Sequence, residues 1–401
     1  LIRLHTLRIL AEEKRDATYY ALIANSLKDT DPHVQRAAVE LLTEYKDVAT
    51  VEAVLSVLHA APTYDTHLIY TSRLALRNLL RDNDLMKQVV AKSWNPEEAG
   101  FIAGTLVDVN SAEAAGFLAT YLNQYSMPAN KVRLAYQQVA RYTPKGKLND
   151  LIAEAQNRKD LDVEVQASMF RGIQDGLVQR GEDTGNRLNA WGTQIAEKLL
   201  KKYPGRSTMG GIVNQQQFAI QLAGDYKVKS VASILKNLVQ PEVKTDSVGD
   251  ADVKTQALRA LLKIAPEQSI VIAGNIVRDS TLEIDYRKRA AAALGEMPGP
   301  AVNKVLAGIK NTPADLEVSI VTALAGSSEG KDIIFDQLQK GQLRTRTLTD
   351  PRVEERMVLN ISNNQQQKFE SLIANIDPIS DERQALIEKR LAAFKLAKST
   401  T

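Results

Sequence analysis

Apolar and polar residues follow one another along this chain with the period of an α-helix. One stretch, residues 284–297, has its apolar positions at Tyr286, Ala290, Ala293, Leu294 and Met297. The spacing i, i+4, i+7, i+8, i+11 places all five on one face of a helix with 3.6 residues per turn. Pro298 and Pro300 follow directly, and proline ends a helix because it has no N–H to donate. The stretch therefore predicts a short helix with one face to bury.

A second short helix follows, with apolar residues at Val302, Val305, Leu306 and Ile309. Isolated helices of this length are only marginally stable in water, so each must pack against neighbours. Arg287, Lys288 and Arg289 lie mostly off the first apolar stripe, and we expect Arg287 to face solvent. By the same pattern we expect Ala37, Ala38, Leu41 and Leu42 to lie in the core between helices.

The two-helix pattern returns along the chain, and where neighbouring units are clear they start about 30–38 residues apart. Its units start at Asp31, Thr66, Ala129, Asp162, Ala251, Pro313 and Asp350. A repeat of helix pairs at this period is typical of an α-solenoid. The stretch "DPHVQRAAVEL" at 31–41 resembles the second helix of a HEAT repeat. The predicted fold is all-α, a HEAT-like solenoid in which helix pairs stack into a right-handed superhelix; the alternative is an irregular helical bundle.

Glycines divide the repeats into two halves. The segment 180–211 holds six of the 21 glycines and one predicted helix, "AWGTQIAEKLLKKY". We expect HEAT-like repeats at 1–179 and again at 212–401, with 180–211 as an insertion or hinge. The other interpretation of 180–211 is a long surface loop. No stretch alternates apolar and polar residues in the way a strand would.

Composition narrows the range of functions. The 401 residues carry 51 basic and 48 acidic side chains, a net charge of +3, which is too balanced to indicate nucleic acid or an anionic membrane as partner. No apolar run approaches the roughly 18 residues needed for a membrane span. The printed chain begins at Leu1, so the lack of a signal peptide says nothing about compartment.

The sequence offers no motif for catalysis. It has no cysteine, which excludes disulfides, thiolate metal sites and covalent haem attachment, and its four histidines do not form a metal-binding pair. No glycine-rich phosphate loop occurs. The acidic stretch at 249–254 only faintly resembles a calcium loop and is read as a helix cap. We therefore predict no catalytic, cofactor-binding or metal-binding residue and no cofactor, and the partner-binding residues stay unknown.

Three clusters of basic residues suggest an alternative, a helical-repeat protein that binds nucleic acid. They are Arg287/Lys288/Arg289, Lys198/Lys201/Lys202 and Arg344/Arg346/Arg352. A nucleic-acid groove would also need aromatic side chains to stack on bases. Here acidic residues are interspersed and only 5% of residues are aromatic, which favours solvated helix faces.

The two ends of the chain differ in pattern. The first ten residues, "LIRLHTLRIL", are apolar on more than one side, whereas a terminal repeat should show a polar outer face. We therefore expect another domain to pack against this end in the parent protein. The last helix carries its apolar residues on one stripe and is expected to close the stack; they are Leu386, Ile387, Leu391 and Phe394.

The last third of the chain resembles a known family. Residues 318–363 hold a helix ending in small residues, then the "LQKGQL" turn, a short polar segment and an Asp-Pro-Arg-Val helix start. This order resembles the HEAT-repeat middle region of large secreted bacterial proteins called putative membrane-bound dehydrogenases with a haem-binding tail, of planctomycete, verrucomicrobial and Bacteroidetes type. In that family a β-propeller precedes the repeats and a cytochrome-c-like domain follows, and neither lies in this chain.

The resemblance and the pattern together favour a non-catalytic scaffold. It would be a protein-interaction segment that links domains of a larger dehydrogenase-like protein. The resemblance implies a periplasmic or extracellular location, and a protein partner or adjacent domains of the same parent chain. Besides the nucleic-acid-binding alternative, a repeat-type lyase or hydrolase acting on a bound chromophore or peptide stays open; a deep pocket with clustered carboxylates or histidines would favour it.

Overall fold

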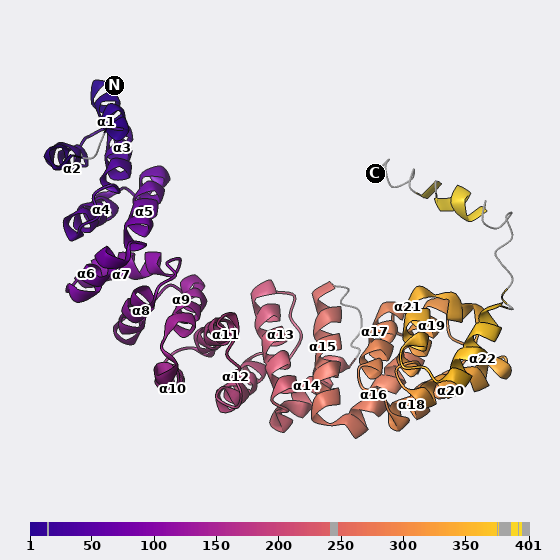
Figure 1. Ribbon diagram of the computed structural model, residues 1–401. Helices are drawn as coiled ribbons and strands as arrows, with labels where there is room; N and C mark the ends of the chain where they lie inside the picture. The colour runs from indigo at the N-terminus through magenta and orange to yellow at the C-terminus, as the bar shows by residue number, and fades with distance from the viewer. Residues whose placement is uncertain (14–15, 241–247, 375, 377–385, 392, 395–401) are drawn as a thin grey trace. The chain divides into compact units, whose positions relative to one another are not determined.

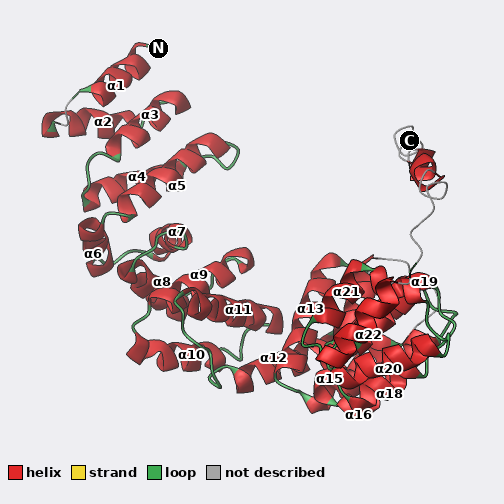
Figure 2. Ribbon diagram, turned by 45° about the vertical axis from the view of Figure 1, so that its right-hand side comes forward, coloured by secondary structure: helices red, strands yellow, loops and turns green. Residues whose placement is uncertain are grey.

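The computed structural model describes residues 1–13, 16–240, 248–374, 376, 386–391 and 393–394. Within these residues every regular element is a helix, and the chain contains no strand there (Figure 2). The all-α prediction is confirmed. The chain divides into two compact units, Leu1–Lys198 and Leu199–Thr401. The division falls inside the predicted 180–211 segment, within its helix α12 (Asn189–Lys202).

The first unit is built from two layers of helices. Odd-numbered helices pack on one another in one layer, α1 on α3, α3 on α5, α5 on α7 and α9 on α11, while α4, α6 and α8 follow one another in the second layer. Figure 1 shows the helices in chain order. The bounds are α1 Ile2–Glu12, α2 Tyr20–Ser26, α3 Pro32–Leu42, α4 Val48–Ala60, α5 Thr66–Leu80, α6 Asn83–Ala91, α7 Pro96–Leu106, α8 Ala112–Gln124, α9 Ala129–Tyr142, α10 Leu148–Asn157 and α11 Val163–Gln179.

The second unit has the same two-layer plan. The helices α13, α15, α17, α19 and α21 pack in succession, and α16, α18, α20 and α22 form the second row. Its bounds are α13 Gly210–Asp225, α14 Ala232–Val239, α15 Val248–Ile264, α16 Pro266–Arg278, α17 Ile284–Gly295, α18 Pro300–Ala307, α19 Ala314–Leu324, α20 Ser328–Gln339, α21 Pro351–Val358 and α22 Asn363–Ala374. In the first unit α3, α5, α7, α9 and α11 start 30 to 34 residues apart, which agrees with the predicted period.

Short polar side chains start the helices where the sequence predicts. At α3 the Asp31 carboxylate accepts a hydrogen bond from the backbone N–H of His33 at 2.9 Å, and Pro32 takes the first helical position. Equivalent caps open the next helices at Asp47, Asp65, Asp82, Asn95 and Ser111. Each satisfies a backbone N–H that the helix itself leaves without a partner, typically worth about 1 kcal/mol.

Two glycines bring α9 and α11 unusually close together. A Cβ added at Gly172 or Gly176 would overlap the carbonyl oxygen of Arg133 or Gln137 on α9. Spaced four residues apart, the two glycines share one face of α11. Their missing side chains let the backbones of the two helices meet. The contact between α9 and α11 is therefore sensitive to any side chain added at these two positions.

The predicted core residues are buried except for Ala37, and one residue predicted to face solvent is buried as well. Ala290, Ala293 and Leu294 are each at most 1% exposed, which confirms the stripe on α17. The prediction for Arg287 is wrong: its side chain is 7% exposed, and its Nε donates to the backbone oxygen of Val277 at 3.0 Å. Ala37 is only half-buried, because it lines a groove described below.

The predictions for two further segments also differ from the structure. Residues 249–254 lie within the first turns of α15, so the acidic stretch is part of the helix itself. The apolar stripe near the C-terminus does not pack in the stack. Its residues are 42–60% exposed: Leu386, Ile387, Leu391 and Phe394. In this structure α22 is therefore the last helix of the packed second row.

Candidate functional site: a groove between α1 and α3

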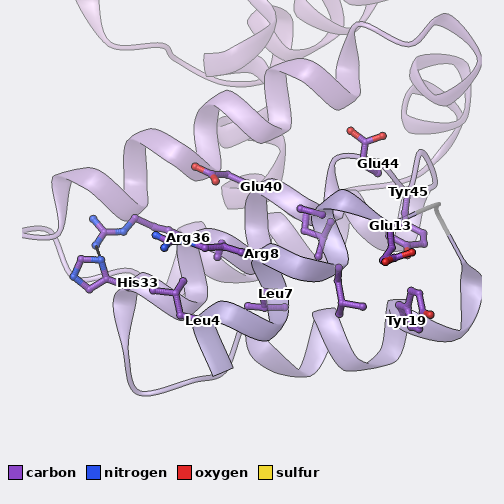
Figure 3. A pocket seen from close by; sticks show the side chains of 14 residues that line it. Leu4, Leu7, Arg8, Glu13, Tyr19, His33, Arg36, Glu40, Glu44 and Tyr45 are labelled. Atoms are coloured by element: carbon purple, nitrogen blue, oxygen red, sulfur yellow. Dashed lines mark hydrogen bonds between the residues drawn. The ribbon is translucent and has the colours of Figure 1, made fainter. Parts of the chain in front are cut away.

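A groove with a volume of about 440 Å³ lies between α1 and α3 in the first unit (Figure 3). Leucines from both helices form its apolar floor. Leu7 of α1 and Leu41 of α3 are 3% and 8% exposed, while Leu4 and Leu10 are half-buried. The half-buried Ala37 keeps the space above the α3 backbone open. The groove therefore offers an apolar surface that this part of the chain does not cover.

Charged side chains of opposite sign separate along the groove. Three nitrogen-bearing side chains lie toward one end: Arg8, Arg36 and His33 (Figure 3). Carboxylates and tyrosines lie toward the other: Glu13, Glu44, Tyr19 and Tyr45 (Figure 3). Glu40 stands between the two groups on α3. A ligand lying along the groove would thus meet positive charge at one end and negative charge at the other.

The basic end is built on the first turns of α3. The Asp31 cap and Pro32 fix the start of the helix, so His33 and Arg36 sit one turn apart and their side chains meet. The Arg36 Nη2 to His33 Nδ1 distance is 3.0 Å. Arg8 of α1 is exposed and makes no ion pair within the described residues. Its guanidinium is therefore available to an acidic group.

The acidic end is held by a contact between the loop after α1 and the turn after α3. The Tyr45 hydroxyl donates to the backbone oxygen of Asp16 at 2.8 Å, and the rings of Tyr45 and Tyr20 meet edge to face at 5.4 Å. The Asp16 carboxylate accepts from the backbone N–H and the hydroxyl of Thr18, which lowers the pKa of Asp16. The contacts with the Asp16 backbone and the Tyr20 ring hold Tyr45 in place as one wall of the groove. Glu40 and Glu44 stay exposed.

This groove could be predicted only in part from the amino-acid pattern. The apolar positions on more than one side of the first helix indicated an uncovered surface, and the structure exposes Leu1, Ile2 and Ile9 by 89%, 83% and 60%. Only the packing of α1 on α3 shows that these exposed residues lie at the same end of the first unit as the groove. No motif marks Arg8, Arg36 and Glu44 as residues of one groove, because they come from separate parts of the chain.

Side chains in two of the three basic clusters form ion pairs with carboxylates of the same chain. Beside the buried Arg287, Lys288 pairs with Asp285 at 3.3 Å, and Arg289 pairs with Asp252 of the neighbouring α15. In the cluster near α21, two arginines pair with carboxylates: Arg344 with Glu317 at 3.7 Å, and Arg352 with Asp350 at 2.9 Å. These cations balance acidic groups of the protein, so they leave little net charge for phosphates. The third cluster, Lys198, Lys201 and Lys202, lies exposed on α12, and the nucleic-acid alternative stays a prediction.

No group of three or more potential metal-binding side chains comes together in the described part of the chain. Over the same residues, no helix is long and apolar enough to span a bilayer. The four histidines do not gather: His59 contacts Glu97 at 2.9 Å, and His33 lies at the groove.

Neither a protein-family model nor a curated protein matches the sequence. Two structural matches share the helical architecture. The chain aligns over 98% of its length with 75% of a chain in a homology model of the full-length AP-3 complex in an intermediate open conformation, at 12% identity and a TM-score of 0.45. It aligns over 84% of its length with 39% of Kap121p in a crystal structure, at 13% identity and a TM-score of 0.45. At such values neither match bears on function.

Proposed function

We propose that this chain is a non-catalytic helical-repeat scaffold that binds a protein segment in the groove between α1 and α3. The observation that carries the proposal is the groove itself, with an apolar floor and charges of opposite sign toward its two ends. An apolar groove with a charged rim is the usual receptor for an amphipathic helix. The helices α3 and α5, which pack on one another, support the groove from one side.

The groove defines the chemistry of its partner. A volume of about 440 Å³ accommodates two or three large apolar side chains, which an amphipathic helix presents at positions i, i+3 and i+4. An Asp or Glu at one end of that helix would meet Arg8 and Arg36. A Lys or Arg at the other end would meet Glu44. The charges therefore fix the direction in which the partner lies.

The family resemblance supplies a setting for the proposal. In that setting the chain is the solenoid that joins the domains of a secreted dehydrogenase-like protein, in the periplasm or outside the cell. The partner would then be a neighbouring domain of the same parent chain. The support is the residue pattern at 318–363 alone. The reading frame on either side of this segment tests the setting: a propeller upstream and a Cys-x-x-Cys-His domain downstream are expected, and their absence refutes it.

Selection of binders from a displayed library of helical peptides tests the groove directly. Peptides enriched on the whole chain should carry an apolar stripe with an acidic and a basic end. Arg8→Glu should weaken their binding about tenfold, because the new carboxylate would face the acidic end of the peptide. Lys310→Glu reverses an exposed cation in the second unit and should leave affinity unchanged. Equal effects of the two substitutions, or binders without charge separation, would refute the proposal.

A further inference from the structure

The C-terminal end of the second unit carries an uncovered apolar groove. It lies between α21 and α22 and has a volume of about 510 Å³. Val358 on α21 is 49% exposed, and Ile361 and Ile373 are half-buried. Two exposed carboxylates stand among the lining residues, Glu354 and Glu370, and neither belongs to an ion pair within the described chain. An apolar surface with carboxylates at its rim suits an amphipathic helix that carries a cation.

A helical segment of the same unit has the complementary pattern. Residues 386–391 and 393–394 are helical, and the exposed stripe is formed by Leu386, Ile387, Leu391 and Phe394. At 100° per residue, Arg390 projects from the same side as this stripe and Lys389 from the opposite side. Arg390 is exposed and makes no ion pair among the described residues. The segment thus combines apolar side chains with a cation, which suits an apolar groove with carboxylates.

The length of the intervening chain allows the two to meet. Eleven residues separate Ala374, the end of α22, from Leu386, and they can span up to about 35 Å. The 12-residue α22 is about 18 Å long, so the segment can reach any point of the groove.

We propose that the helical segment formed by residues 386–391 and 393–394 docks into the groove between α21 and α22 and covers it. The docked segment places three apolar side chains against Val358 and Ile373 of the groove: Leu386, Ile387 and Leu391. Its cation, Arg390, lies between Glu354 and Glu370. The charged residues on the far side of the helix then form the polar outer face. In the undocked arrangement, the same groove is the surface that a competing helix would occupy.

Because the chain has no cysteine, two spin labels can be placed without altering any native thiol. Labels at Gln367→Cys on α22 and Glu388→Cys on the segment occupy exposed positions. Pulsed dipolar spectroscopy of the full-length chain should give one narrow distance population. Leu391→Asp should reduce that population about tenfold, since it removes a buried apolar side chain and places a carboxylate next to two others. A broad distribution that Leu391→Asp leaves unchanged would overturn the proposal.

Charge reversal distinguishes docking through the assigned charge contact from non-specific hydrophobic association. Arg390→Glu should reduce the narrow population, and adding Glu354→Lys with Glu370→Lys should restore it. Failure of this restoration would contradict the assigned contact. Dilution of the labelled chain with excess unlabelled chain should leave the distance unchanged; its loss would show that the occupant comes from a second copy. Circular dichroism of each variant checks that the helices remain folded. None of these results depends on the groove at α1 and α3.

Discussion

At the close contact between α9 and α11, a Gly→Ala substitution has two opposite effects on stability. The steric clash destabilises the fold, whereas the higher helix propensity of alanine stabilises it. Alanine is a better helix former than glycine by about 0.5–1 kcal/mol, so Gly→Ala inside a helix normally stabilises. At Gly176 the added Cβ would overlap the Gln137 carbonyl oxygen and lie 2.8 Å from the Ala140 Cβ. Ordinary contact begins at 3.4 Å. Backbone atoms cannot rotate away, so α9 and α11 must separate.

We expect Gly176→Ala to destabilise the first unit by about 2–4 kcal/mol. Overpacking of a well-packed core costs about 1–3 kcal/mol, and a clash with backbone lies at the upper end of this range or beyond it. The matched control is Gly116→Ala in the interior of α8, where an added Cβ meets nothing within 4 Å. That change should stabilise by about 0.5–1 kcal/mol.

Urea denaturation gives the free energy of unfolding for both variants, and hydrogen exchange locates the change. Because a solenoid of two units need not unfold in one step, the exchange rates of amides in α9 and α11 are the decisive measurement. They should rise in Gly176→Ala and not in Gly116→Ala. If Gly176→Ala is as stable as the parent chain, or if its exchange rises equally in the second unit, the reasoning is wrong.

Three further predictions concern single side chains. Arg287→Ala should lower the free energy of unfolding by about 1.5–3 kcal/mol in urea titration, because it leaves the buried Val277 oxygen without its donor, whereas Lys288→Ala should change it by less than about 0.5 kcal/mol. Leu294→Ala should cost about 2–5 kcal/mol in the same assay, since the side chain is fully buried; a cost below 1 kcal/mol would contradict the assigned core. Burial raises the pKa of Tyr136 to about 12, so the folded chain keeps a proton that the unfolded chain loses near pH 10. Stability should therefore fall from about pH 10 to 12, and Tyr136→Phe should make this fall smaller by about 2 kcal/mol in thermal or urea unfolding; an unchanged fall would refute the shift.

Periodicity in the sequence predicts the features that depend on one helix at a time. Ala38, Leu42 and Ala290 are buried because residues at i, i+3 and i+4 must share a face, whatever the neighbour is. The helix starts at Asp31 and Asp350 follow from the same local reasoning. These features need no knowledge of how the repeats are placed relative to one another.

Features that depend on a partner helix could not be predicted from the sequence. Arg287 lies off the apolar stripe, yet it is buried because the end of α16 offers it the Val277 oxygen. The groove between α1 and α3 combines residues as far apart as Leu4 and Glu44, so only the packing of the two helices reveals it. The glycine pair at 172 and 176 was a usable signal, because small residues four apart often mark a close helix contact.

A charge-swap experiment at the groove between α1 and α3 tests the central claim most directly. An amphipathic peptide selected on the parent chain is measured by titration calorimetry against Arg36→Glu, and then with its own acidic residue changed to lysine. We expect a loss of about tenfold in affinity with Arg36→Glu and recovery of most of it with the lysine peptide. Binding that ignores Arg36→Glu, or a lysine peptide that binds the variant no better, would contradict the claim that this groove is the interaction surface.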